Sequence, residues 1–294
     1  DYLLNTNNLL TVNGWMYFPA TDENGTELWK TDGTAANTVM VKDINPGIAS
    51  SGPNELIDFN NVVYFAADDG VHGLELWKTD GTEAGTVMVK DINPGAGNGV
   101  STFYARGIYM NRFYFMADDG VHGLEPFSTD GTAAGTVLLK DIVPGTGGSM
   151  DSKADFAVYN GLLYFSAIDP AKGYELFRTD GTAAGTVLAA DINPGSKWST
   201  PTSFKVFNGY LYFSADGFSN NQETWRTDGT QANTILFADF LNTSPSFPTF
   251  TVVGNTLYID VNNGIGYLYA TDGTQANITL IKNQDGTQLS APMM

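Results

Sequence analysis

The stretch LELWKTDGTEAGT, residues 74–86, decides the fold because close copies of it recur along the chain. The copies read ELWKTDGTAANT at 27–38, EPFSTDGTAAGT at 125–136, ELFRTDGTAAGT at 175–186, ETWRTDGTQANT at 223–234 and YLYATDGTQANI at 267–278. Counted at the threonine that opens TDGT, the spacings are 48, 50, 50, 48 and 44 residues. Repeats of about 40–50 residues are typical of propellers and solenoids, so this period outweighs any domain count based on length.

Each repeat has the same internal order of short apolar segments, which the second copy shows most clearly. It contains NELIDF (54–59), VVYFAAD (62–68), LELWKTD (74–80) and TVMVKDI (86–92), separated by Asn, Asp, Gly and Pro. Segments this short, rich in β-branched and aromatic residues and bounded by turn residues, are typical of strands and leave no room for a helix. Four antiparallel strands in each of six repeats predict an all-β fold, a six-bladed β-propeller.

We expect one propeller domain over 1–294, with a tail at 284–294. A linear solenoid is the structural alternative, but it normally has polar capping repeats, and the first and last repeats here look like ordinary members. The predicted blades span approximately 7–47, 53–95, 102–145, 153–195, 202–243 and 249–283.

The repeated TDGT is expected to be a hairpin turn between the third and fourth strands of each blade. Asp-Gly is a strong tight-turn signal because glycine accepts positive φ. The aspartate and threonine side chains can bond the backbone amides just ahead of them. The motif therefore predicts local structure and says nothing by itself about activity.

The repeat E-L-W-x-T-D-G-T followed by x-A-G-T resembles the ELWxxDGT repeat of large exported bacterial surface proteins. The resemblance covers essentially the whole chain, and the turn is similar in role to the Asp-box turn of sialidase-like propellers. It implies a propeller on an exported protein, at the cell surface or outside the cell, and it implies no particular activity. The sixth copy departs most, with Tyr267 in place of the glutamate and Tyr269 in place of the Trp or Phe.

Residues that recur in every blade are most simply explained as blade-building residues. We expect the recurring glutamates to accept hydrogen bonds from neighbouring backbone or hydroxyl groups, and the recurring aromatics to pack between blades. A ring of catalytic or metal-binding carboxylates is the alternative for the glutamates. The glutamates are Glu27, Glu75, Glu125, Glu175 and Glu223.

Residues that differ between blades are the better candidates for binding, since variable loops on a rigid scaffold commonly carry recognition. The connection GSKWSTP (195–201) contains Lys197 and Trp198, an aromatic without a counterpart in the other connections. The connection GAGNGVSTFYARG (95–107) contains Tyr104 and Arg106. Exposed aromatics beside a cation grip sugar rings or peptide anchors. These four residues are the predicted ligand-binding set, with Trp198 preferred and core packing as its alternative.

The loops between second and third strands contain clustered acids, as in ADDGVHGLE of blades two and three. Asp68, Asp69, Asp118 and Asp119 are weak candidates for calcium ligands, because calcium prefers oxygen donors. Ordinary turn chemistry is the alternative, since no EF-hand spacing is present. His72 and His122 hold equivalent loop positions, which favours a habit of the repeat over catalysis.

Composition limits the partners. The formal net charge is −18, so nucleic acid and anionic lipid are disfavoured. No apolar run reaches the roughly 18 residues of a membrane-spanning helix, and the absence of cysteine excludes disulfides and thiol-ligated metals. The first residues, DYLLNTNN, lack a signal-peptide pattern and an initiator Met, which is typical of a processed chain or an excised segment.

Motifs for metalloprotease, serine-hydrolase, phosphate-loop or cysteine chemistry are missing from the sequence. We therefore expect a non-enzymatic binding module that takes a carbohydrate or a protein at the bacterial cell surface, with no required cofactor. A structural or self-assembling subunit of an extracellular assembly is one alternative. A propeller-type polysaccharide hydrolase or lyase is the other, since a pair of glycosidase carboxylates has no sequence spacing to test.

Overall fold

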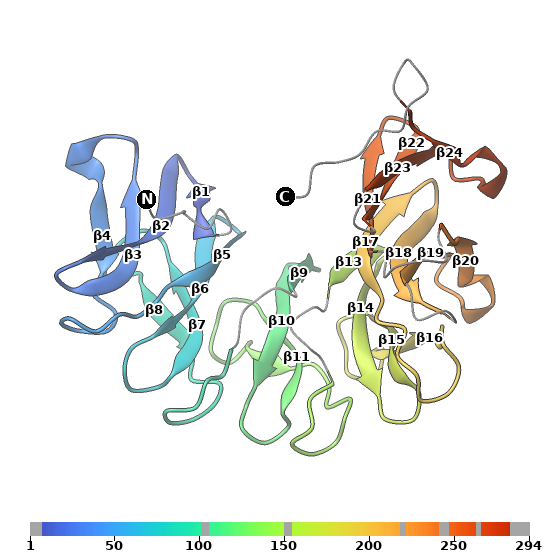
Figure 1. The fold of residues 1–294 in the computed structure, drawn as a ribbon. Coiled ribbons are helices and arrows are strands. Elements are labelled where there is room, and N and C mark those ends of the chain that lie inside the picture. The colour runs from blue at the N-terminus through green and yellow to red at the C-terminus, as the bar shows by residue number, and fades with distance from the viewer. Residues whose placement is uncertain are drawn as a thin grey trace. The chain divides into compact units, whose positions relative to one another are not determined.

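The computed structural model describes residues 8–100, 106–149, 155–217, 222–240, 247–262 and 266–282. These residues form six four-stranded antiparallel sheets, each built from four consecutive strands (Figure 1). The predicted all-β class, a six-bladed propeller with four strands per blade, is confirmed. Within the described residues, no helix has the length and hydrophobicity that crossing a bilayer requires.

The chain divides into two compact units, Asp1–Ser152 and Lys153–Met294, with three blades in each. In the first unit the strands are β1 (Leu10–Val12), β2 (Trp15–Asp22), β3 (Gly25–Thr31), β4 (Val39–Lys42), β5 (Asn54–Phe59), β6 (Val62–Asp68), β7 (Leu74–Thr79), β8 (Val87–Lys90), β9 (Arg106–Tyr109), β10 (Arg112–Asp118), β11 (Leu124–Thr129) and β12 (Val137–Leu138).

The second unit repeats this plan. Its strands are β13 (Phe156–Tyr159), β14 (Leu162–Asp169), β15 (Gly173–Thr179), β16 (Val187–Ala190), β17 (Thr202–Phe207), β18 (Tyr210–Asp216), β19 (Gln222–Thr227), β20 (Ile235–Ala238), β21 (Phe247–Val253), β22 (Thr256–Asn262), β23 (Tyr267–Thr271) and β24 (Thr279–Leu280). Short 3₁₀ turns follow three of the TDGT motifs, at Ala35–Asn37, Gln231–Asn233 and Gln275–Asn277.

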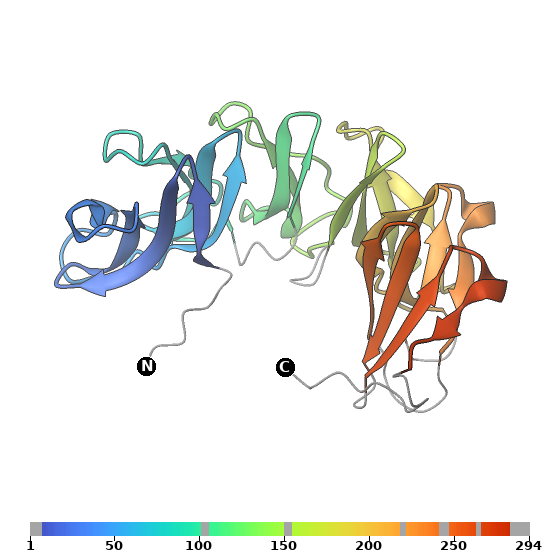
Figure 2. The same ribbon diagram turned by 90° about the horizontal axis from the view of Figure 1, so that it is seen from above.

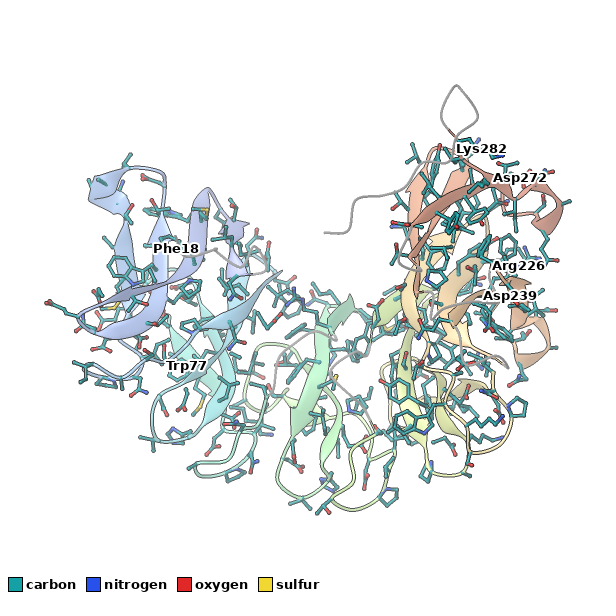
Figure 3. The ribbon with its side chains drawn as sticks, in the orientation of Figure 1. Phe18, Trp77, Arg226, Asp239, Asp272 and Lys282 are labelled. Atoms are coloured by element: carbon teal, nitrogen blue, oxygen red, sulfur yellow. The ribbon has the colours of Figure 1, made fainter. Side chains whose placement is uncertain are left out.

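Neighbouring sheets of one unit pack face to face, as the sheets β17–β20 and β21–β24 do in Figure 2. The second strand of blade two shows why VVYFAAD is apolar almost throughout. Phe65 packs toward blade one with Tyr17, whereas Tyr64 packs toward blade three with Phe113. Side chains alternate across a strand, and here both faces of the sheet are covered, so both alternating sets are buried. Trp77, labelled in Figure 3, belongs to the core between blades one and two, as expected for a recurring aromatic.

The TDGT turn has the hydrogen bonds that the sequence predicts. In blade two, Asp80 Oδ1 accepts from the backbone N–H and the hydroxyl of Thr82, at 2.9 and 2.7 Å. Thr79 Oγ1 accepts from the Gly81 N–H at 2.9 Å, and Gly81 has φ of +92°. The same aspartate–threonine bonds recur in all six turns. They lower the pKa of the six turn aspartates, with the threonine hydroxyl as the largest cause.

The turn also contacts the preceding blade, which the sequence did not indicate. A lysine or arginine of that blade donates a hydrogen bond to the carbonyl of the turn glycine. Lys30 Nζ of blade one donates to the Gly81 carbonyl of blade two at 2.7 Å, and Lys78 donates to the Gly131 carbonyl of blade three at 2.7 Å. Arg178 and Arg226 make the same bond to Gly229 and Gly273, at 3.0 and 2.8 Å. Four of the six turns are therefore docking points between blades of one unit as well as hairpins.

The recurring glutamates are buried acceptors, as expected. Glu75 is fully buried and accepts the backbone N–H groups of Ile92 and Asn93 at 3.0 and 3.1 Å, just after the fourth strand. Glu27, Glu125 and Glu175 take the equivalent N–H groups in their own blades. Glu223 differs, since it accepts from the Gly217 N–H at 2.9 Å. Apart from Glu223, each of these carboxylates thus bonds the third strand of its blade to the segment that follows the fourth strand. The bonds lie within single blades and do not bring the glutamates together into one site.

Candidate functional site

Strand order sorts the loops of a blade onto two ends. Each sheet is a simple meander, so the first-to-second turn and the TDGT turn lie at one end of the blade. The second-to-third loop and the connection to the next blade lie at the other end. We call these the turn end and the connection end.

Trp198 is an exposed aromatic at the connection end of blade four. Its residue is 55% exposed, although its ring still contacts Tyr174, with ring centroids 6.0 Å apart. Exposure of this size is inconsistent with the alternative that Trp198 is a core residue. Tyr174 itself is buried, so it forms a fixed support beneath the indole.

The residue after Trp198 anchors the loop. Ser199 is fully buried, and its hydroxyl donates to Glu175 Oε2 at 2.7 Å. The N–H groups of Ser199 and Thr200 both donate to the Tyr174 carbonyl, at 2.9 and 3.1 Å. The backbone on the C-terminal side of the indole is thus hydrogen-bonded to β15, which holds the ring in place without a ligand.

The equivalent positions in blades one and two show how Trp198 differs from its counterparts. Ser50 Oγ accepts from the Thr26 N–H at 2.9 Å, and Asn98 Oδ1 accepts from the Leu74 N–H at 2.9 Å. Small polar side chains at this position therefore bond the start of the third strand. An indole ring has no acceptor atom for this bond, so the side chain of Trp198 is free for another role.

The buried carboxyl of Glu175, which bonds Ser199 of this loop, has a raised pKa. Burial raises the pKa of its carboxyl to about 7, against the opposing hydrogen bonds from Ile192 and Ser199. The nearby Asp191 also raises this pKa. Asp191 is itself paired with Lys172, whose Nζ lies 2.6 Å from its Oδ2. The connection end of blade four thus places hydrogen-bonded Glu175 and the Lys172–Asp191 ion pair around one exposed indole.

The other predicted contact residues do not all join Trp198. Lys197 is exposed, and its side chain has no hydrogen bond or ion pair within the described part of the chain. Arg106 is paired with the buried Glu55 of the preceding blade, Nη1 to Oε2 at 3.0 Å, so it has a structural partner. Tyr104 lies outside the described residues. The ligand contacts proposed for Arg106 and Tyr104 stay predictions.

The candidate calcium ligands bond their own loops. Asp68 Oδ1 accepts from the Gly70 N–H at 2.7 Å, and Asp69 accepts from His72 through both the backbone and the ring, the latter at 2.8 Å. Asp118 and Asp119 repeat these bonds in blade three. The bond to Asp69 raises the pKa of the His72 imidazole. Among the residues that the structure describes, no three His, Asp or Glu side chains are grouped closely enough to hold a metal ion.

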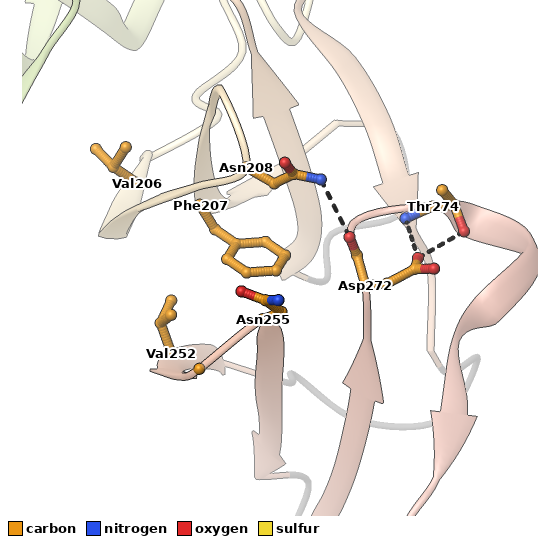
Figure 4. A pocket seen from close by; sticks show the side chains of 8 residues that line it. Val206, Phe207, Asn208, Val252, Asn255, Asp272 and Thr274 are labelled. Atoms are coloured by element: carbon orange, nitrogen blue, oxygen red, sulfur yellow. Dashed lines mark hydrogen bonds between the residues drawn. The ribbon is translucent and has the colours of Figure 1, made fainter.

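A pocket at the turn end of blades five and six was not predicted from the sequence. It has a volume of about 680 Å³. Its walls are Val206, Phe207 and Asn208 before and in the β17–β18 turn, Val252, Gly254 and Asn255 around the β21–β22 turn, and Asp272 and Thr274 of the last TDGT turn (Figure 4). Every first-to-second turn of this chain contains an asparagine, so no sequence signal distinguished these two turns from the others.

The comparisons with known proteins agree with the fold and give no function. No family model and no curated protein matches the sequence. A prolyl endopeptidase structure resembles it with a TM-score of 0.55 at 11% identity, over 97% of this chain and 42% of that one. Puromycin hydrolase resembles it with a TM-score of 0.51 at 11% identity, over 94% of this chain and 46% of that one.

The GH74 enzyme of Niastella koreensis is a third neighbour. It has a TM-score of 0.50 at 13% identity, over 92% of this chain and 44% of that one. The chain thus spans less than half the length of each of these three enzymes. Identities this low indicate a shared propeller-type architecture only, because one fold hosts many unrelated functions.

Proposed function

We propose that this chain is a non-enzymatic binding module of an exported bacterial protein, and that it holds a glycan, a surface polymer or a protein partner at the connection end of blade four. The observation that carries the proposal is the exposed indole of Trp198, supported from below by Tyr174 and flanked by the backbone-anchored Ser199. An aromatic held in place before binding loses little conformational entropy when a ligand stacks on it.

The chemistry around the indole favours a neutral polymer, because the net charge of −18 disfavours polyanions. The exposed ammonium of Lys197 directly precedes Trp198 and can bond hydroxyl or carboxylate oxygens. Stacking of an apolar sugar face on an indole, with a polar group beside it, is a common way to hold carbohydrate. The net charge of −18 supports an extracellular polymer or protein in preference to nucleic acid.

The test is retention on an immobilised panel of bacterial and plant polysaccharides, compared between the wild type and Trp198→Ala. We expect retention to fall at least about tenfold, while the melting temperature changes little because an exposed side chain contributes little to stability. Ile48→Ala is the matched control, since Ile48 is an apolar residue of the blade-one connection that is 90% exposed.

Three results would contradict the proposal. Equal loss of retention in Trp198→Ala and Ile48→Ala would assign binding to general surface hydrophobicity. Release of soluble product from the panel by the wild type would favour the hydrolase or lyase alternative. Concentration-dependent multimers in light scattering, unchanged in Trp198→Ala, would instead favour a structural subunit.

A further inference from the structure

We infer that the pocket between blades five and six is a second binding site, separate from Trp198, and that it accepts a single uncharged sugar residue. Trp198 lies at the connection end of blade four, whereas the pocket lies at the turn end of the same unit. The inference does not depend on the function proposed for Trp198.

The pocket lies where the usual hydrogen bond between the first-strand turns of neighbouring blades is replaced by a bond to a different acceptor. Elsewhere, the turn that ends the first strand bonds directly to the same turn of the next blade. Asn13 Nδ2 donates to the Asn61 carbonyl at 3.4 Å, and Asn60 Nδ2 donates to Asn111 Oδ1 at 2.9 Å. The hydroxyl of Tyr159 donates to the Gly209 carbonyl at 2.6 Å in the second unit.

Blade five does not form this bond between first-strand turns. Asn208 Nδ2 donates instead to the carbonyl of Asp272, in the TDGT turn of blade six, at 3.3 Å (Figure 4). No hydrogen bond in the described structure joins the turn at Asn208 to the turn at Gly254 and Asn255. The two first-strand turns are therefore left unbridged, and the hollow of about 680 Å³ opens there.

The lining determines the class of ligand. It contains two exposed amide side chains, Asn208 and Asn255, above an apolar wall of Val206, Phe207 and Val252. An amide carries both donors and acceptors, as does each sugar hydroxyl, so amides match a hydroxyl-rich ring whose C–H face covers the valines. The volume falls within the usual range for small-molecule sites, about 300–1,000 Å³.

Charged ligands fit less well. The lining has no lysine, arginine or histidine to pair with an anion. Its one acid, Asp272, already accepts the N–H and the hydroxyl of Thr274 at 2.9 and 2.7 Å, and the amide of Asn277 at 2.6 Å. A cation would have to compete with these three bonds, so a neutral ring is favoured.

The experiment titrates the intact chain with methyl glucoside, methyl galactoside and N-acetylglucosamine, using glucuronate and glucosamine as charged comparisons, and follows binding by ligand-observed NMR. We expect at least one neutral sugar to bind with a Kd on the order of 1 mM, and the charged sugars to bind at least about fivefold more weakly. Binding of no neutral sugar at concentrations of about 50 mM, fifty times that Kd, would overturn the inference.

Two variants locate the site. Val206→Trp fills the pocket from its wall, and we expect it to abolish binding. Val158→Trp is the matched control in blade four, because Val158 and Val206 hold the same strand position and are 46% and 45% exposed. Asn255→Ala removes one amide and should weaken binding at least about fivefold, whereas Trp198→Ala should leave it unchanged. Equal effects of Val206→Trp and Val158→Trp, or loss of binding in Trp198→Ala, would place the sugar elsewhere and refute the second site.

Discussion

The two units fasten their blades with different chemistry at the same place. In the first unit, a lysine at the end of the fourth strand reaches forward, with Lys42 Nζ to the Thr86 carbonyl at 2.9 Å and Lys90 Nζ to the Thr136 carbonyl at 2.8 Å. In the second unit, a glutamine after the TDGT motif reaches back. Gln231 exchanges two hydrogen bonds with the backbone of Asp191.

The lysine and the glutamine do not occur together at one seam: the glutamine is present where the preceding fourth strand has no lysine. Gln275 Nε2 likewise reaches back to the Phe237 carbonyl at 2.7 Å. Blades that end in Ala190 and Ala238, with no lysine, are the ones followed by a turn that carries a glutamine. Each of the four seams within the two units therefore has one side chain that joins the fourth strand to the next turn, and either blade can supply it. Repeated residues build the blades and dock their turns, while these variable residues add a further bond between neighbouring blades.

The largest loss of folding stability is expected from substitution of a TDGT-turn glycine. In both units this glycine packs against a tyrosine of the preceding blade. Gly131→Ala would force a Cβ into the hydroxyl of Tyr64, at a residue with φ of +91°. Gly33→Ala is the control, because Gly33 has φ of +95° and its added Cβ meets nothing within 4 Å. We expect backbone strain alone to cost about 1–2 kcal/mol in Gly33→Ala, and overpacking to cost about 1–3 kcal/mol more in Gly131→Ala.

Urea unfolding measures the free energy of unfolding for both variants. Equal losses in the two variants would show that the tyrosine moves aside and that the turn is not docked as described. The seam between blades two and three would then depend on the lysine bonds alone.

The second prediction replaces the lysine that bonds two blades of the first unit with the glutamine arrangement of the second unit. Lys90→Ala should lower the free energy of unfolding by about 1.5–3 kcal/mol, because it removes a partly buried hydrogen bond from a charged donor to the Thr136 carbonyl. Adding Ala133→Gln recreates the arrangement of Ala190 with Gln231, and should restore about 1 kcal/mol through neutral hydrogen bonds. Urea unfolding of the two single variants and the double variant forms the cycle.

Ala133→Gln alone is the control, and it should change stability little because Lys90 already occupies the seam. If the double variant is no more stable than Lys90→Ala, the two fasteners are not interchangeable, and the reciprocal pattern has another origin.

The third prediction concerns a feature that the units share, the buried glutamates. Burial raises the pKa of Glu75 and of Glu175 to about 7. An acid whose folded pKa lies above its unfolded value binds more protons when folded, so its contribution to stability is present below about pH 4.5 and is lost as pH rises toward 7. We expect the melting temperature to fall by roughly 2–4 °C for each kcal/mol lost between pH 5 and 8.

Glu175→Gln mimics the protonated acid and should flatten this pH dependence in part. Calorimetric scans across pH 5–8 for the wild type and the variant make the comparison. The six turn aspartates, whose pKa values are lowered, titrate below this window and do not contribute to it. A melting temperature that rises from pH 5 to 8 would contradict the prediction.

Much of the fold was predictable from local chemistry. The Asp80-Gly81 turn, the alternation in VVYFAAD and the repeat spacing each predicted strands that the structure contains. The hydrogen-bonding role of Glu75 followed from its recurrence. Trp198 was predicted to be free because no other connection has an aromatic there, and its exposure agrees.

The pocket and the fasteners were beyond sequence reasoning. Asn208 looks like any other turn asparagine, and its distinguishing property is the carbonyl it selects, 64 residues away. Lys42 and Gln231 look like unrelated surface residues until their carbonyl partners, 44 and 40 residues distant, are known. Arg106 was expected to face a ligand, and the structure gives it a partner in Glu55, 51 residues earlier.

By itself the sequence determined the strands, the turns and their grouping into four-stranded blades, because glycine φ preference, side-chain capping and two-residue alternation all act within a few positions. Tertiary structure alone decided how one blade meets the next: which side chain supplies the fastener, where Asn208 points and why a hollow opens beside Asn255. A hydrogen bond depends on donor and acceptor meeting within about 3 Å, and between blades that meeting is set by packing of the sheets and not by position along the chain.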